Sequence, residues 1–101
     1  MNVEINEEPT GDGVKFTVAG HIDSVCAYKL QVKLDEALKS RKHNIIVNMS
    51  QVEYMCSIGL RILLKAYKDA IEAGSKLGIE QPSENVKKVL VLTSSTDMIL
   101  I

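Results

Sequence analysis

Ser57 is the first candidate for chemistry, because it stands just ahead of a predicted helix. From Leu60 onward, apolar residues recur at positions i, i+3, i+4, i+7 and i+11, which predicts an α-helix that opens at Gly59 and runs to residue 73. The first N–H groups of a helix lack partners within it and favour oxygen atoms and negative charge. The hydroxyl of Ser57 is therefore either a helix cap or a group placed for phosphorylation.

Catalysis and cofactor binding receive little support from the other reactive side chains. A hydrolase needs a base to activate Ser57 or Cys56, and Met55 occupies the position where a nucleophile elbow requires glycine. The two histidines, His21 and His43, form no metal-binding spacing with the cysteines, and no Walker sequence is present. We therefore expect no enzyme activity, no cofactor and no metal. Redox sensing by Cys56 is a further alternative, because a helix N-terminus favours negative charge.

Composition predicts one soluble globular domain over residues 1–101. Apolar residues make up 46% of the chain and charged residues 25%, so wholesale disorder is not expected. The net charge of -1 gives no general attraction to nucleic acids or anionic lipids, which argues against both as direct partners. The acidic N-terminus does not resemble a signal peptide, and no run of about 18 apolar residues is present, so we expect a cytoplasmic protein.

The first half of the chain predicts a hairpin, a helix and a strand. Residues 1–7 and 14–18 alternate apolar and polar side chains, and the segment between them reads as a connection longer than a two-residue turn. A loop over residues 20–24 precedes a helix over 25–40, which Asp23 or Ser24 can cap. A β-branched run over 44–48 predicts a central strand, followed by a loop over 49–58.

The second half continues the alternation of helix and strand. After the helix that follows Ser57, Gly74 provides a C-terminal cap, residues 76–80 form a strand, and Pro82-Ser83 precedes a helix over 84–92. Residues 98–101 predict a last strand. The order β-β-α-β-α-β-α-β predicts an α/β fold with a mixed, mostly parallel sheet of four to five strands and three to four helices. If the strands before the two long loops are adjacent and parallel, Asp23 and Ser57 lie on one edge.

The segment around Ser57 resembles the phosphorylation loop of anti-sigma factor antagonists of the STAS domain family. A strand, a polar turn with Ser50, Val52 and Met55, and then Cys56-Ser57-Ile58-Gly59-Leu60 are similar to the family's Asp-Leu-Ser followed by Asp-Ser-Ser-Gly-Leu. The loop Gly20-His21-Ile22-Asp23 is similar to the family's Gly-Glu-Leu-Asp. The resemblance covers nearly the whole chain and implies a STAS-like fold.

The resemblance also assigns roles to individual positions. It implies that Ser57 is the serine phosphorylated by a partner kinase and that Asp23 is the acid of the neighbouring loop; helix capping is the alternative role for Asp23. Four positions depart from the family pattern: Cys56 replaces Asp, Ile58 replaces Ser or Thr, and Asn48-Met49 replaces Asp-Leu. These changes remove negative charge from beside the hydroxyl.

The resemblance implies a bacterial regulator of transcription that acts indirectly. Unphosphorylated, such a protein binds an anti-sigma factor with serine kinase activity; phosphorylation at Ser57 ends the binding, and a serine phosphatase restores it. We expect the partner-binding residues to be His21, Asp23, Met55, Cys56, Ile58, Gly59 and Arg61. A scaffold module of a larger signalling assembly, without a phosphoserine cycle, is the alternative, because the acid is missing at Cys56.

Overall fold

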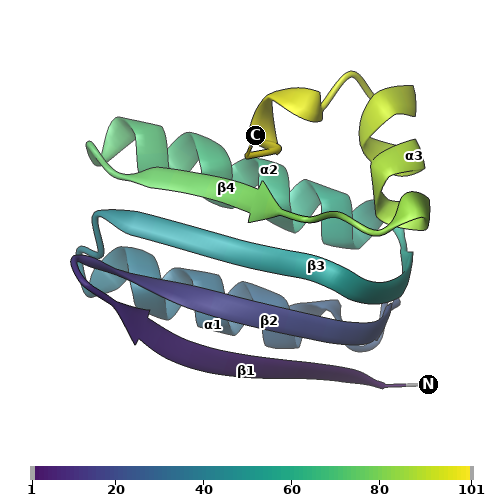
Figure 1. The fold of residues 1–101 in the computed structure, drawn as a ribbon, viewed down its shortest axis with the longest axis horizontal. Coiled ribbons are helices and arrows are strands. Elements are labelled where there is room, and N and C mark those ends of the chain that lie inside the picture. Colours follow the sequence, from purple (N-terminus) through teal and green to yellow (C-terminus); the bar gives the residue numbers. More distant parts are fainter. Residues whose placement is uncertain (1, 101) are drawn as a thin grey trace.

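A four-stranded sheet with two long helices against one face forms the body of the molecule in this computed structural model, which describes residues 2–100 (Figure 1). Neighbouring strands are antiparallel between β1 and β2 and parallel between β2 and β3 and between β3 and β4, so the predicted mixed, mostly parallel sheet is confirmed. The elements are, in order, β1 (Val3–Thr10), β2 (Gly13–Ile22), α1 (Ala27–Lys39), β3 (Asn44–Met55), α2 (Ser57–Glu72), β4 (Lys76–Glu80), α3 (Glu84–Leu92) and a short 3₁₀ turn (Thr96–Met98).

The core lies between the sheet and the helices α1 and α2. Alternate residues of β2, Val14, Phe16 and Val18, are almost fully buried, as expected for one face of a half-buried strand. Leu30 of α1 and Leu63 of α2 are also fully buried and belong to the same apolar cluster. No helix of residues 2–100 lies over the face of β1 and β2 that is turned away from α1 and α2 (Figure 1).

The connection between β1 and β2 is shorter than the sequence predicts. Thr10 pairs directly with Gly13, so only Gly11 and Asp12 form the turn, and the expectation of a longer connection is wrong. The reason is that the first strand continues through Pro9. An edge strand tolerates proline where its missing N–H would point away from the sheet.

β3 is also longer than predicted, because its second half pairs irregularly with β2 and does not show the alternation of apolar and polar residues that identifies a strand. Thr17 pairs with Asn48 but Ala19 pairs with Gln51, and a second shift follows at Gly20. Each shift breaks the alternation of buried and exposed residues on which strand prediction depends. The expected loop over 49–58 is therefore mostly strand, and β2 similarly continues through the expected loop to Ile22.

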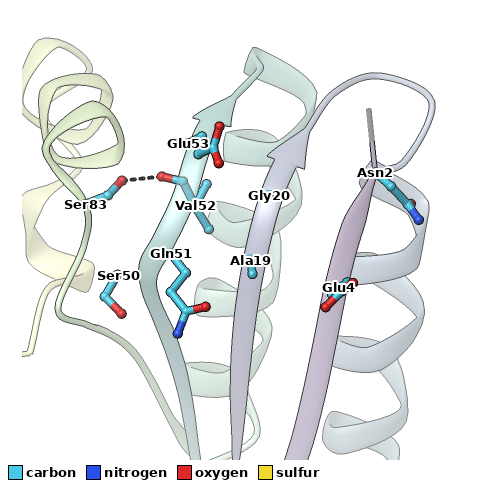
Figure 2. A pocket seen from close by; sticks show the side chains of 9 residues that line it. All are labelled: Asn2, Glu4, Ala19, Gly20, Ser50, Gln51, Val52, Glu53 and Ser83. Carbon is cyan, nitrogen blue, oxygen red and sulfur yellow. Dashed lines mark hydrogen bonds between the residues drawn. The ribbon is translucent and has the colours of Figure 1, made fainter.

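The start of α3 supplies partners for the irregular part of β3. β4 ends at Glu80, opposite Asn48, so β3 has no strand beyond that point on this side. The backbone N–H of Ser83 donates to the Met49 carbonyl at 3.1 Å, and its hydroxyl donates to the Val52 carbonyl at 2.6 Å (Figure 2). Asn85 Nδ2 donates to the Glu53 carbonyl at 2.7 Å. These bonds satisfy backbone carbonyls that a neighbouring strand would otherwise satisfy.

A row of polar side chains, Lys15, Glu80 and Asn48, crosses the sheet next to the first register shift of β3; we call it the polar ladder. Lys15 Nζ lies 2.9 Å from Glu80 Oε2, and Asn48 Nδ2 donates to the same oxygen at 2.7 Å. The side-chain oxygen Oδ1 of Asn48 accepts from the Ser50 hydroxyl at 2.7 Å. The hydrogen bond from Lys15, followed by the hydrogen bond from Asn48, lowers the pKa of the Glu80 carboxyl, and Glu80 raises the pKa of Lys15. The ladder connects β2, β3 and β4.

The predicted helices agree with the structure except at their ends, but the prediction of a last strand over 98–101 is wrong for the described residues 98–100. The strand over 76–80 and the helix over 84–92 are confirmed, and Gly74, with φ of 77°, follows α2 as expected. α1 begins two residues later than predicted and α2 two residues earlier. In place of the last strand, the structure has a single bridge from Ile79 to Ile99; residue 101 lies outside the described residues.

Replacing Ser83 tests the attachment of α3 to β3. The Ser83 hydroxyl donates to the Val52 carbonyl and also accepts the Val86 N–H at 3.3 Å. Ser83→Ala therefore removes both the cap of α3 and the hydrogen bond that joins the start of α3 to β3. We expect the free energy of unfolding, measured by urea denaturation, to fall by about 2 kcal/mol. The exposed Ser40 is the matched control, and Ser40→Ala should change it by less than about 0.5 kcal/mol. Equal free energies of unfolding for Ser83→Ala and Ser40→Ala would contradict the stabilising role of the Ser83 hydroxyl.

Candidate functional site

Ser57 is the first residue of α2, and its hydroxyl faces solvent. Cys56, not Ser57, occupies the N-cap position, with extended backbone angles (φ -81°, ψ 171°) and no side-chain hydrogen bond to the helix. The interpretation of Ser57 as the helix cap is therefore wrong. Within the described part of the chain, the exposed Ser57 hydroxyl has no hydrogen-bond partner. The hydroxyl therefore stands exposed at a helix end that favours negative charge.

The carboxyl ends of β2 and β3 lie side by side and bring together the segments that contain Asp23 and Ser57. Ile22 pairs with Met55, and the Cys56 N–H donates to the Ile22 carbonyl at 2.9 Å. Asp23 directly follows β2, and α2 begins at Ser57, two residues after the end of β3. The prediction that Asp23 and Ser57 lie on one edge of the sheet is thus confirmed.

Asp23 organises the turn that leads into α1. Its Oδ1 accepts the N–H of Cys26 at 2.8 Å and that of Val25 at 3.0 Å, and its backbone carbonyl accepts the N–H of Ala27 at 3.0 Å. The hydrogen bond from the Cys26 backbone is the main cause that lowers the pKa of the Asp23 carboxyl. Cys26, and not Asp23, is the N-cap residue of α1, so the expectation that Asp23 caps this helix is wrong; its carboxylate instead holds the turn before α1.

Two of the expected contact residues lie beneath the surface. Met55 is 4% exposed and Gly59 is buried, so the expectation that they contact a partner directly is wrong. Met55 is buried because β3 continues to this residue and turns its side chain into the core. A Cβ atom at position 59 would lie 2.7 Å from Ile22 Cγ2, so glycine allows α2 to approach β2 closely. Both residues are therefore part of the packing beneath the start of α2 and not of its surface.

The remaining expected residues lie near the end of β2 and at the start of α2. Ile58 and Arg61 are exposed, Cys56 is half-buried, and His21 lies at the end of β2 with its Nε2 3.7 Å from Glu53 Oε2. The His21 ring also lies 6.4 Å, centroid to centroid, from the ring of Tyr54.

Sequence reasoning missed two large exposed side chains on this edge. Val25 is 75% exposed, and Tyr54, the neighbour of His21, is 50% exposed. The sequence pattern places Val25 in a helix and Tyr54 in a loop, and neither prediction specifies whether the side chain is exposed. The signal for Val25 was its position directly after the Asp23-Ser24 turn and outside the apolar stripe of the predicted helix. With Ile58, these residues give the edge an apolar character suited to a protein partner.

A shallow hollow of about 620 Å³ lies on the sheet face opposite α1 and α2 (Figure 2). Small residues, Ala19, Gly20 and Ser50, line it together with Glu4 and Glu53. Ser57 does not line the hollow, so the candidate site is the edge and not this concavity. In residues 2–100, no cluster of His, Cys, Asp or Glu is arranged to hold a metal ion, and no helix is long and apolar enough to cross a membrane.

Comparison with known proteins agrees with this arrangement. The model of the STAS domain matches residues 2–101. The chain belongs to the STAS domain family. Among curated relatives, the anti-sigma-B factor antagonist of Bacillus subtilis is 26% identical over 99 residues, covering 98% of this chain and 90% of that protein. The anti-sigma-B factor antagonist of Listeria monocytogenes is 28% identical over 99 residues, covering 98% and 86%.

Solved structures share the STAS fold described above. The unphosphorylated anti-sigma factor antagonist SpoIIAA superposes with a TM-score of 0.84 at 18% identity, covering 96% of this chain and 86% of that one. An anti-sigma factor antagonist from Mycobacterium paratuberculosis gives a TM-score of 0.85 at 21% identity, covering 96% and 82%. The expected STAS-like fold is therefore confirmed.

Removing the Asp23 carboxylate should destabilise the protein in a pH-dependent manner. The pKa of Asp23 is lowered by folding, so its contribution is complete above the ordinary aspartate pKa and disappears as pH falls through the folded value. We expect Asp23→Ala to lower the urea midpoint at pH 7, with a difference from the wild type that shrinks under strongly acidic conditions. Asp23→Asn, which keeps an acceptor, should have a smaller effect. Asp12→Ala, in an exposed turn, is the control; an equal effect there would contradict the assigned role.

Proposed function

We propose that this chain is an anti-sigma factor antagonist controlled by phosphorylation of Ser57. The observation that carries the proposal is the exposed Ser57 hydroxyl at the start of α2, on the same edge as the Asp23 turn. The names of the curated relatives, which are anti-sigma factor antagonists, support it. The partner is an anti-sigma factor with serine kinase activity, and this chain is its substrate and not an enzyme. The ATP is bound by the kinase, and a serine phosphatase restores the hydroxyl.

The effect of phosphorylation on binding is electrostatic. A phosphoserine carries about -1.5 to -2 charges at neutral pH. Docking would cover the apolar side chains Val25, Tyr54 and Ile58 together with the phosphate, which must then lose water. An unpaired charge at an interface costs roughly 2–5 kcal/mol. This corresponds to weaker binding by about 30-fold to several thousand-fold, without any refolding of the chain.

The departures from the family pattern affect recognition by the kinase. Cys56 and Ile58 flank Ser57 without a carboxylate or a second hydroxyl. The kinase therefore meets a less acidic loop with a single hydroxyl in the segment 56–60. We infer that the cognate kinase contacts the apolar side chain of Ile58, which is 40% exposed.

Phosphate incorporation tests the modification site. The protein is incubated with its cognate anti-sigma kinase and ATP, and the product is analysed by intact mass and peptide mapping. We expect one phosphoryl group on Ser57 and none in Ser57→Ala. The exposed serine of the adjacent turn gives the control Ser24→Ala, which should be modified like the wild type. Unchanged incorporation in Ser57→Ala would refute the assignment.

Binding by Ser57→Asp separates the switch from the scaffold alternative. The carboxylate imitates part of the phosphate charge, so calorimetry should show binding to the anti-sigma factor weakened by about tenfold or more. Ser57→Ala should bind nearly as well as the wild type, because it adds no charge. Binding of Ser57→Asp at wild-type strength would instead favour a scaffold role without a phosphoserine cycle.

A further inference from the structure

β1 forms an open edge of the sheet. It pairs only with β2, and no strand among the described residues covers its other side. The His21 N–H donates to the Asn2 carbonyl at 3.1 Å, so the main-chain groups of Asn2 point toward β2. Because antiparallel pairing alternates inward and outward groups, the N–H and C=O groups of Ile5 and Glu7 point away from the sheet.

The two ends of this edge are closed to pairing. Asn2 Oδ1 accepts the Val3 N–H at 2.9 Å, and Pro9, at an outward position, has no N–H to donate. Edge strands are commonly protected by such devices. Here they leave a short open stretch around Ile5 and Glu7, which is long enough for an added segment to form several main-chain hydrogen bonds.

An apolar groove of about 310 Å³ runs beside this open stretch, between β1 and α1. Its apolar residues include Ile5, Tyr28 and Val32, and the last two are 58% and 48% exposed. Val25, Tyr28 and Val32 follow one another at helical spacing, so an exposed apolar stripe leads from the edge with Ser57 into the groove. A strand added beside β1 would place alternate side chains in this groove.

The charged side chains on the face of β1 opposite the groove indicate which kind of segment could pair with this edge. Glu4, Asn6 and Glu8 alternate with the groove residues, and both glutamates are exposed; Glu8 lies opposite Lys15 of β2, but among the described residues neither glutamate has an ion pair shorter than 4.0 Å. Antiparallel pairing with a second copy would bring these carboxylates beside their own equivalents, which is unfavourable. A segment with lysine or arginine at these positions would be attracted instead.

We propose that the β1 edge binds an extended segment of a partner protein as a fifth strand. Apolar residues at alternate positions of the segment occupy the groove beside Tyr28 and Val32, and basic residues at the intervening positions face Glu4 and Glu8. The site goes beyond the proposed function, because it requires neither Ser57 nor its phosphorylation. Binding should therefore be the same for wild type and Ser57→Ala.

A fluorescein-labelled peptide of repeating Lys-Val units is the probe, and fluorescence anisotropy at physiological salt is the measurement. A Glu-Val repeat tests the charge, and a block peptide with all lysines before all valines tests the alternation. We expect the Lys-Val repeat to bind at least about tenfold more tightly than either. Equal binding of the three peptides, or binding of none, would overturn the proposal.

Variants of Glu7 test the main-chain contacts. Glu7→Pro removes an outward N–H, whereas Glu7→Ala removes the same side chain, including its 3.4 Å contact with Lys33, and keeps the N–H. Affinity for the Lys-Val peptide should fall about tenfold or more in Glu7→Pro relative to Glu7→Ala. Equal affinities in two folded variants would overturn the proposal. So would a concentration-dependent dimer in sedimentation that Glu7→Pro abolishes, because the occupant would then be a second copy.

Hydrogen exchange of the wild type gives a measurement that does not depend on the folding of Glu7→Pro. The amides of Ile5 and Glu7 should exchange more slowly when the Lys-Val peptide is added, because they become hydrogen-bonded. The amide of Leu92, in an exposed position at the end of α3, should not change. Unchanged exchange at Ile5 and Glu7 under saturating peptide would exclude strand addition.

Discussion

The hydrogen bond from the Cys56 N–H to the Ile22 carbonyl closes the parallel pairing of β2 and β3 at 2.9 Å. It fixes the last residue of one strand beside the first turn of α2, so the Asp23 turn and the Ser57 hydroxyl must share an edge. Gly59 makes the arrangement possible, because a larger residue would push α2 away from Ile22. The position of the hydroxyl is thus set by backbone pairing, and not by any contact that the serine side chain makes.

The irregular end of β3 requires partners that the sheet itself does not provide. Ser83 and Asn85 supply them from α3, and Asn48 anchors the point where the bend begins. Asn48 stands where the family usually has aspartate. Its amide can donate to Glu80 while its oxygen accepts from Ser50, whereas a carboxylate at this position would face the Glu80 carboxylate. The neutral side chain is therefore compatible with the ion pair between Lys15 and Glu80.

The sequence predicted the order of elements as far as the helix over 84–92, the strand over 76–80 and the shared edge of Asp23 and Ser57, because these depend on local periodicity and on the alternation of strands and helices. It did not predict the second half of β3, since register shifts are a property of two paired strands and leave no regular pattern in either. It placed Met55 on the surface for the same reason. The exposure of Val25 and Tyr54 depends on how α1 and β3 pack, which residue type alone does not reveal.

The two-residue turn between β1 and β2 lies at the opposite end of the sheet from Ser57. Gly13 pairs with Asn44 at one end of β2, while Ile22 pairs with Met55 at the other. Asp12 in this turn is exposed, whereas Gly11 has a φ of +36°, which a residue with a side chain adopts only with strain. This hairpin tip is a suitable attachment point for a fluorophore, an affinity handle or a surface linkage, because a group tethered there would leave the serine-bearing edge unobstructed.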